Sequence, residues 1–128
     1  MIPTRAINLD TLDPTAEEYF LPADRLIQGN PRQTLWNQYT DPSGQFFVGI
    51  WRSEPGTWHI AYTEEEYCQV IQGRSLVTDE TGNMLSVGPG DSFVIPRGFR
   101  GTWEVVETTT KRFVIHEASR PEGTGQKR

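Results

Sequence analysis

The sequence predicts an all-β protein, folded as a closed or double-sheet barrel. Two stretches, 56–73 and 88–103, each combine a short strand pattern with glycines where a barrel needs tight turns or close backbone approach. The segment between them, 74–87, has the pattern of two strands joined by a turn at 80–83. The chain also holds 9 prolines and 12 glycines, which is typical of β proteins with many turns.

Length, charge and cysteine content narrow the class of protein. The chain has 128 residues, enough to bury a core as one domain over residues 1–128. Its net charge of −5 argues against a nucleic-acid partner, because phosphate binding depends on clustered Lys and Arg. One cysteine excludes an intramolecular disulfide framework and suits a reducing compartment. With no visible signal peptide or membrane-length apolar run, we expect a cytoplasmic protein that binds no membrane.

Residues 1–30 are predicted to form a lead-in to the barrel rather than a separate domain. Two short helices are expected, over 15–19 and 23–28, with Pro22 between them and Gly29 ending the second. Pro14 suits the turn that begins the first helix. We expect this lead-in to cover an open end of the barrel.

From residue 33 the pattern changes to strands. Segments 33–40 and 45–53 are separated by a turn at 41–44, and another turn follows at 54–56. Turn spacing of this kind fits a sandwich or barrel. The later strands are predicted over 57–63, 66–73, 75–79, 83–87, 91–96, 101–107 and 111–117. The barrel therefore spans 33–117 with about nine or ten strands, and 118–128 form a loose polar tail.

Motifs within this barrel resemble those of the cupin superfamily. Glu66, followed after six residues by Gly73, fits the end of the first cupin motif, and Gly90 with the Pro-x-Gly at 96–98 fits the start of the second. The Trp-rich first strand, Glu-x-Cys, Gly-Asp-x-Phe-Val-x-Pro-x-Gly and Thr-Trp-x-Val-x-Glu resemble, more specifically, the ureidoglycine aminohydrolase-like cupin group. The resemblance implies the cupin double-stranded β-helix, a jelly-roll barrel, and a homodimer.

Standard cupins build a metal site from three histidines and a glutamate. This chain has 2 histidines, His59 and His116, so one chain cannot supply that set. In the second motif, Gly101 stands where the histidine would be. His116 is expected at the surface or at an interface. We therefore expect no cofactor, because a lone carboxylate holds a transition metal poorly. The alternative is a reduced metal site of Glu66, His59 and Cys68.

The face of strand 57–63 that points inward depends on how the first motif is aligned. One alignment places His59 and Ala61 at the ligand positions, and the other places Ile60 and Tyr62 there. We prefer the second alignment because it puts Trp58, Ile60 and Tyr62 on an apolar inner face and turns His59 outward.

Glu66 is the main catalytic candidate, since an inward carboxylate in an apolar barrel could act as a general base or acid. Tyr62 could orient a ligand through its phenol. Structurally, Glu66 could instead be paired with Lys111 or Arg112. Aromatic side chains could line a small-molecule cavity, and the predicted ligand-binding residues are Trp36, Trp51, Trp58, His59, Cys68, Trp103 and Lys111.

Two functions fit these residues. The first is a metal-independent acid–base enzyme, a hydrolase, deaminase or isomerase acting on a small polar metabolite, resembling ureidoglycine aminohydrolase. The second is a non-catalytic cupin that binds or senses a small ligand or serves as an accessory module. Under the first hypothesis Glu66→Gln abolishes turnover and preserves binding, whereas under the second it changes affinity alone.

Overall fold

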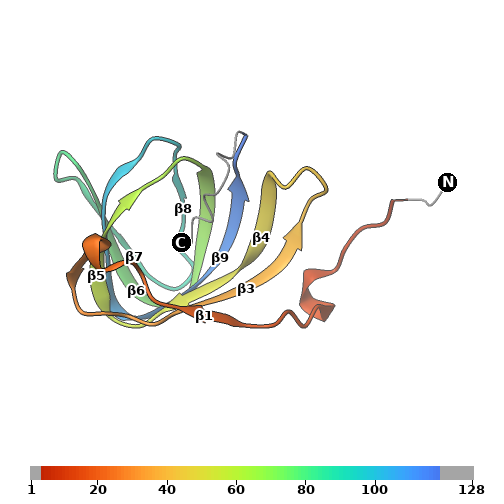
Figure 1. Ribbon diagram of the computed structural model, residues 1–128, viewed down its shortest axis with the longest axis horizontal. Helices are drawn as coiled ribbons and strands as arrows, with labels where there is room; N and C mark the ends of the chain where they lie inside the picture. Colours follow the sequence, from red (N-terminus) through yellow and green to blue (C-terminus); the bar gives the residue numbers. More distant parts are fainter. Residues whose placement is uncertain (1–3, 119–128) are drawn as a thin grey trace.

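The computed structural model describes residues 4–118, which are almost entirely β-structure (Figure 1). These residues form two 3-10 turns, η1 (Leu9–Thr11) and η2 (Ala23–Arg25), and nine strands. The strands are β1 (Glu17–Tyr19), β2 (Leu26–Gln28), β3 (Gln33–Thr40), β4 (Phe46–Ser53), β5 (Gly56–Ala61), β6 (Glu65–Asp79), β7 (Met84–Val87), β8 (Ser92–Ile95) and β9 (Arg100–His116). None of the described residues lies in a helix long and apolar enough to cross a membrane.

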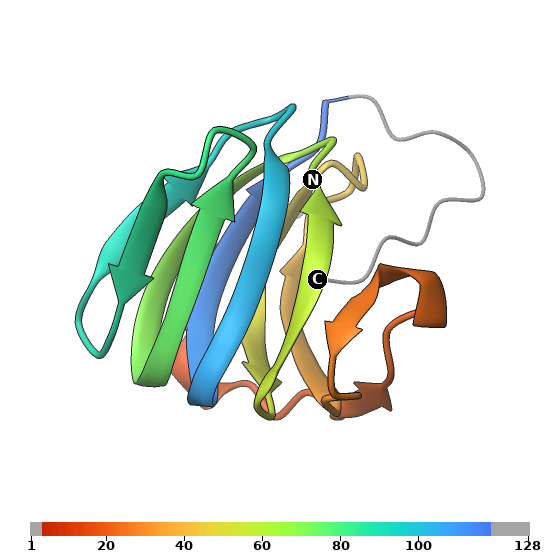
Figure 2. The ribbon, with the colours of Figure 1, turned by 90° about the vertical axis from the view of Figure 1, so that its left-hand side faces the viewer.

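The strands make one antiparallel sheet that curls around its own inner face, as the barrel prediction requires (Figures 1 and 2). The central pair of this sheet is formed by its two longest strands, β6 and β9. The other edge of β9 is shared by β4 and β5, which β3 and β2 extend, with β1 beyond β3. The other edge of β6 is shared by β7 and β8. Both long strands therefore contribute side chains along most of the interior.

The predicted helices at 15–19 and 23–28 are wrong. Residues 17–19 form β1 on the free edge of β3, and η2 leads directly into β2, which pairs with β5. Segments this short gain little from helix formation, because nucleating a helix is costly. Pairing with an exposed strand edge satisfies their backbone groups instead.

The predicted break at Gly73 is also wrong, because β6 runs through it as a bulge. The register against β9 shifts between Val70 and Ser75, and Gly73 has a φ of +89°. A Cβ at Gly73 would collide with the carbonyl of Thr108. The glycine therefore permits a bend in a continuous strand, where the sequence had indicated a turn between two strands.

The predicted turn at 41–44 is confirmed. The turn at 41–44 closes with a hydrogen bond from Gly44 N to Asp41 O, 3.0 Å long. Asp91 accepts a 2.8 Å hydrogen bond from Gly88 N, so this side chain shapes the turn before β8.

The inward face of β5 is the one that the second motif alignment predicts. Trp58, Ile60 and Tyr62 are buried, and His59 is exposed on the opposite face. The three buried residues belong to a core that also contains Trp51, Trp103, Phe113, Ile95 and Ile115. The alternation follows from the two-residue period of a strand.

Candidate functional site

A buried ion pair lies inside the barrel. Glu66 on β6 and Lys111 on β9 have side chains that are 0% and 1% exposed, and Lys111 Nζ lies 2.9 Å from Glu66 Oε2. Lys111 pairs in register with Val70, four residues along β6 from Glu66. Because four residues of strand span about 13 Å, the two side chains extend toward each other along the inner face. The pairing that the sequence left open for Glu66 is thus made with Lys111.

Two tryptophans enclose the ammonium group. Lys111 Nζ lies 4.8 Å from the ring centre of Trp51 and 4.4 Å from that of Trp103. The two rings meet edge to face, with centroids 5.5 Å apart. Trp51 also contacts Trp58 edge to face at 6.2 Å. Cation–π attraction to both rings helps to stabilise the charged lysine in an apolar interior.

Cys68 lies beside the ion pair. Its sulfur accepts a hydrogen bond from Lys111 Nζ, 3.5 Å away, and the residue is fully buried. Burial is the main cause that raises the pKa of the Cys68 thiol; the Glu66 carboxylate raises it further, and Lys111 opposes both. Cys68 therefore stays a thiol at neutral pH, and this environment is unlike that of a reactive cysteine.

Lys111 keeps its charge despite its burial. Burial alone would lower the pKa of Lys111, but Coulombic attraction to Glu66 and hydrogen bonding to Glu66 and Cys68 outweigh it, so the pKa lies above its ordinary value. Because Cys68 is protonated, Glu66 supplies the negative charge that holds the ammonium. The centre of the barrel is thus a charged but net-neutral pair.

Polar atoms at this centre lack hydrogen-bond partners. Glu66 Oε2 has the Lys111 ammonium as its partner, 2.9 Å away. Within residues 4–118, Glu66 Oε1 and Trp103 Nε1 have no hydrogen-bond partner. Trp51 differs, because its Nε1 donates to Gln33 Oε1 at 2.8 Å. Buried polar groups normally have a partner, so these two atoms are exceptions in the barrel interior.

Ile60 and Gly101 stand at positions where standard cupins have metal-binding histidines, and neither fits a transition metal. Ile60 offers no donor atom, and a Cβ at Gly101 would collide with the carbonyl of Thr78, so no ligating side chain fits there. The Glu66 carboxylate already contacts an ammonium group. Throughout the described part of the chain, no group of three or more His, Cys, Asp and Glu could hold a metal ion. His59 faces outward, so the alternative set of Glu66, His59 and Cys68 is not brought together.

The structure gathers most of the predicted site residues and separates two of them. Tyr62 lies in the buried core with Trp58. Trp36 instead lies under the Arg52 guanidinium, 5.5 Å from it, in an outer groove of about 350 Å³. His59 lines another surface pocket, of about 530 Å³, with Arg25 and Arg100. Ligand binding by Trp36 and His59 would therefore be separate from the interior pair. His116 is exposed, as expected.

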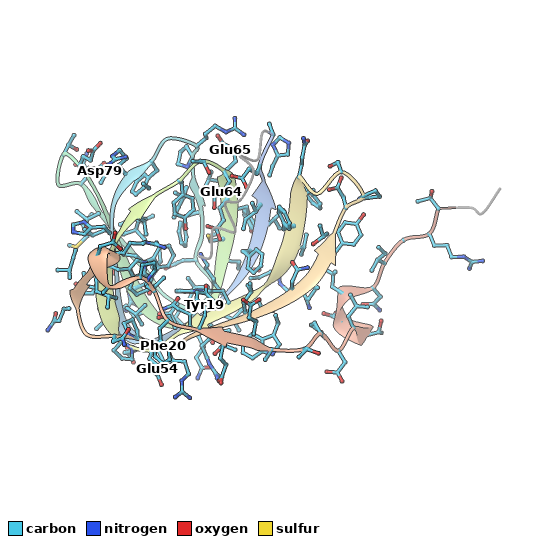
Figure 3. The ribbon with its side chains drawn as sticks, in the orientation of Figure 1. Tyr19, Phe20, Glu54, Glu64, Glu65 and Asp79 are labelled. Atoms are coloured by element: carbon cyan, nitrogen blue, oxygen red, sulfur yellow. The ribbon has the colours of Figure 1, made fainter. Side chains whose placement is uncertain are left out.

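Two further buried carboxylates were missed. Glu64 and Glu117 are 1% and 4% exposed, and neither is among the site residues predicted from the sequence. Thr63 Oγ1 donates to Glu117 Oε2 at 2.7 Å, and Thr63 N donates to Glu64 Oε1 at 3.0 Å. Figure 3 shows Glu64 beside Glu65 at one end of the barrel. The missed signal is alternation, because Tyr62, Glu64, Glu66 and Cys68 are all buried at a spacing of two.

Comparison with known structures finds the same fold. A protein of unknown function from Pseudomonas syringae pv. tomato aligns with a TM-score of 0.73 at 20% identity, over 79% of this chain and 44% of that one. EutQ of Clostridium difficile aligns with a TM-score of 0.65 at 20% identity, over 87% of this chain and 100% of that one. The ethanolamine utilization protein Q of Salmonella typhimurium aligns at 0.62 and 16%, over 82% and 99%.

These likenesses show the fold alone. This chain spans less than half the length of the Pseudomonas protein. None of the curated proteins matches it in sequence. Residues 40–113, more than half of the chain, match the family model of the EutQ-like cupin domain. The chain therefore belongs to the EutQ-like cupin domain family.

Proposed function

We propose that this cupin binds a small polar molecule inside its barrel, against Glu66, Lys111 and Trp103. The observation that carries the proposal is a pair of buried polar atoms beside Lys111, Glu66 Oε1 and Trp103 Nε1, which have no hydrogen-bond partner among residues 4–118. A ligand that donates to the carboxylate and accepts from the indole would remove the cost of leaving these groups unpaired. An aromatic surround with few polar groups is typical of small-molecule sites.

Acid–base chemistry is the activity that suits these groups. Glu66 is the group that could accept a proton from a substrate or from water, and the Lys111 ammonium, 2.9 Å away, could stabilise negative charge that develops beside it. The resemblance to ureidoglycine aminohydrolase-like cupins supports a hydrolase or deaminase, with an isomerase as a further possibility. The proposed reaction needs no metal, because Lys111 provides the positive charge beside the carboxylate.

A second candidate is a binding or accessory module without catalysis. It is favoured by the two family metal positions, which hold an apolar side chain at Ile60 and, at Gly101, a glycine beside which no side chain fits. Such a barrel keeps a ligand-binding interior while lacking the metal chemistry of related enzymes.

Thermal-shift screening of small polar metabolites tests the shared part of both proposals. A ligand of the interior should raise the melting temperature of the wild type and of Trp36→Phe, an outer-face control, more than that of Trp103→Phe. Equal stabilisation of all three proteins would place the ligand elsewhere and overturn the proposal. For a confirmed ligand, NMR then measures whether it is consumed. Loss of consumption with retained binding in Glu66→Gln, but not in the exposed control Glu107→Gln, supports the enzyme; a ligand that is never consumed supports the binding module.

A further inference from the structure

We infer that the interior site selects uncharged ligands that both donate and accept hydrogen bonds, in preference to carboxylates and amines. This inference rests on the proposed function and names its ligand class. It follows from the charge balance of the Glu66–Lys111 pair and from the kinds of atoms left without partners around it.

The first argument is charge. Glu66 and Lys111 are both fully buried and cancel each other at 2.9 Å. In register, Glu66 is flanked by the apolar side chains of Ile95 and Ile115, and Lys111 by Val70 and Trp51. A charged ligand would therefore bring a charge without a counter-ion into an apolar interior, which is strongly unfavourable.

The second argument concerns cations. A cationic ligand could in principle bind against tryptophan faces, but the Lys111 ammonium already lies over both Trp51 and Trp103. Two further buried acids, Glu64 and Glu117, already accept hydrogen bonds from Thr63. A cation is thus the competitor that an experiment has to exclude.

The third argument is hydrogen bonding. The unpartnered atoms around the pair, within the described residues, are one acceptor, Glu66 Oε1, and one donor, Trp103 Nε1. A carboxylate offers acceptors alone and would face the Glu66 oxygens with no proton between them. An ammonium or amidinium offers donors alone and would leave Trp103 Nε1 unpaired. A neutral amide or alcohol supplies both kinds of group.

Three probes of nearly equal shape separate these possibilities: acetamide, acetate and acetamidinium, which are neutral, negative and positive at neutral pH. The chain has 4 tryptophans, so its indole N–H signals in a ¹H–¹⁵N spectrum can be assigned with single Trp→Phe variants. We expect acetamide to shift the Trp103 signal saturably, with a Kd at least about tenfold below those of the other two. The signal of Trp36, on the outer face, should not move.

The outcomes are distinguishable. If acetate or acetamidinium shifts the Trp103 signal at concentrations equal to or below those of acetamide, the selection for uncharged ligands is wrong and the interior site stands. If none of the three shifts that signal, while the wild type remains folded, the interior site itself is overturned. Loss of acetamide binding in Trp103→Phe with retention in Trp36→Phe supports both the site and its selectivity.

Discussion

Lys111 and Glu66 meet inside the barrel although the sheet places them four residues out of register: Lys111 pairs with Val70, and its Nζ lies 2.9 Å from Glu66 Oε2. The long lysine side chain extends along β6, with Nζ 3.5 Å from the Cys68 sulfur and facing the rings of Trp51 and Trp103. The pair links the two longest strands at the centre of the fold. Its effect on stability therefore depends on whether one or both charges are present.

Removing one member of the pair should destabilise the protein more than removing both. Lys111→Met leaves the Glu66 carboxylate buried without a cation, and we expect it to lower the free energy of unfolding by about 3–5 kcal/mol. Adding Glu66→Leu should recover most of that loss, because two apolar side chains can replace a buried ion pair. Urea unfolding of the two single variants and the double variant measures the coupling.

Arg112→Met is the matched control for this cycle, because Arg112 is the next residue on β9 and is only half-buried. It should change stability by no more than about 0.5 kcal/mol, as surface substitutions usually do. A double variant as unstable as the sum of its two single variants would show that Glu66 and Lys111 are not energetically coupled.

Stability should fall at alkaline pH in two stages. The pKa of Cys68 is raised from its ordinary 9.0 and that of Lys111 from its ordinary 10.5. Each group thus binds its proton more tightly in the folded than in the unfolded chain, so unfolding releases protons and stability falls as pH rises. The contribution of Cys68 is complete below about pH 9 and declines above it; that of Lys111 declines above about pH 10.5.

Cys68→Ala separates the two stages. Urea midpoints measured across alkaline pH should begin to fall near pH 9 in the wild type, but only near pH 10.5 in Cys68→Ala. An identical onset in both proteins would mean that Cys68 has an ordinary pKa in the folded chain. If stability of Cys68→Ala instead begins to fall well below pH 10.5, the thiol is needed to keep Lys111 charged.

Local patterns predicted much of the barrel. The two-residue period predicted the inner face of β5, and the turn residues predicted the connection at 41–44, because these features depend on neighbours in sequence. The lead-in was mispredicted as helical because pairing with the edges of β3 and β5 is decided by tertiary structure. The homodimer stays a prediction from family resemblance.

The site was predicted less completely for a related reason. Glu66 was found by its motif, but whether Lys111 is solvated or buried depends on a partner that strand register brings near. The sequence alone could not show which tryptophans point inward: Trp51 and Trp103 lie in the core, whereas Trp36 lies on the outer face beside Arg52. Whether an indole N–H has a partner also depends on packing. Trp51 and Trp103 both point inward, but Trp51 Nε1 donates to Gln33 whereas Trp103 Nε1 bonds to no described residue.

Restoring the family's histidine at position 101 should fail to restore a metal site. Gly101→Ala alone brings a Cβ against the Thr78 carbonyl, and we expect it to cost about 3 kcal/mol because the collision is with backbone rather than with a movable side chain. Gly101→His should be at least as unstable and should take up no transition metal by elemental analysis.

Gly82→Ala is the control for position 101. Gly82 has a φ of +91° and no atom within 4 Å of an added Cβ, so its substitution tests backbone strain without collision and should cost about 1–2 kcal/mol. A stable Gly101→His protein that binds metal stoichiometrically would show that the barrel can open at this position and that the glycine does not exclude the ligand.

The two tryptophans that enclose Lys111 should respond differently to the same substitution. Trp51→Phe leaves the Gln33 Oε1 acceptor buried without its 2.8 Å donor, whereas Trp103→Phe removes an indole N–H that bonds to no described residue. Both variants lose similar ring area and weaken one cation–π contact, because a phenyl ring attracts the ammonium less than an indole ring does. We therefore expect Trp51→Phe to be less stable than Trp103→Phe by about 1–3 kcal/mol, the cost of an unsatisfied buried polar atom. Chemical unfolding without added ligand measures this difference. Equal losses would mean that Trp103 Nε1 also has a hydrogen-bond partner in the folded protein, which would contradict its assignment as an unpaired donor.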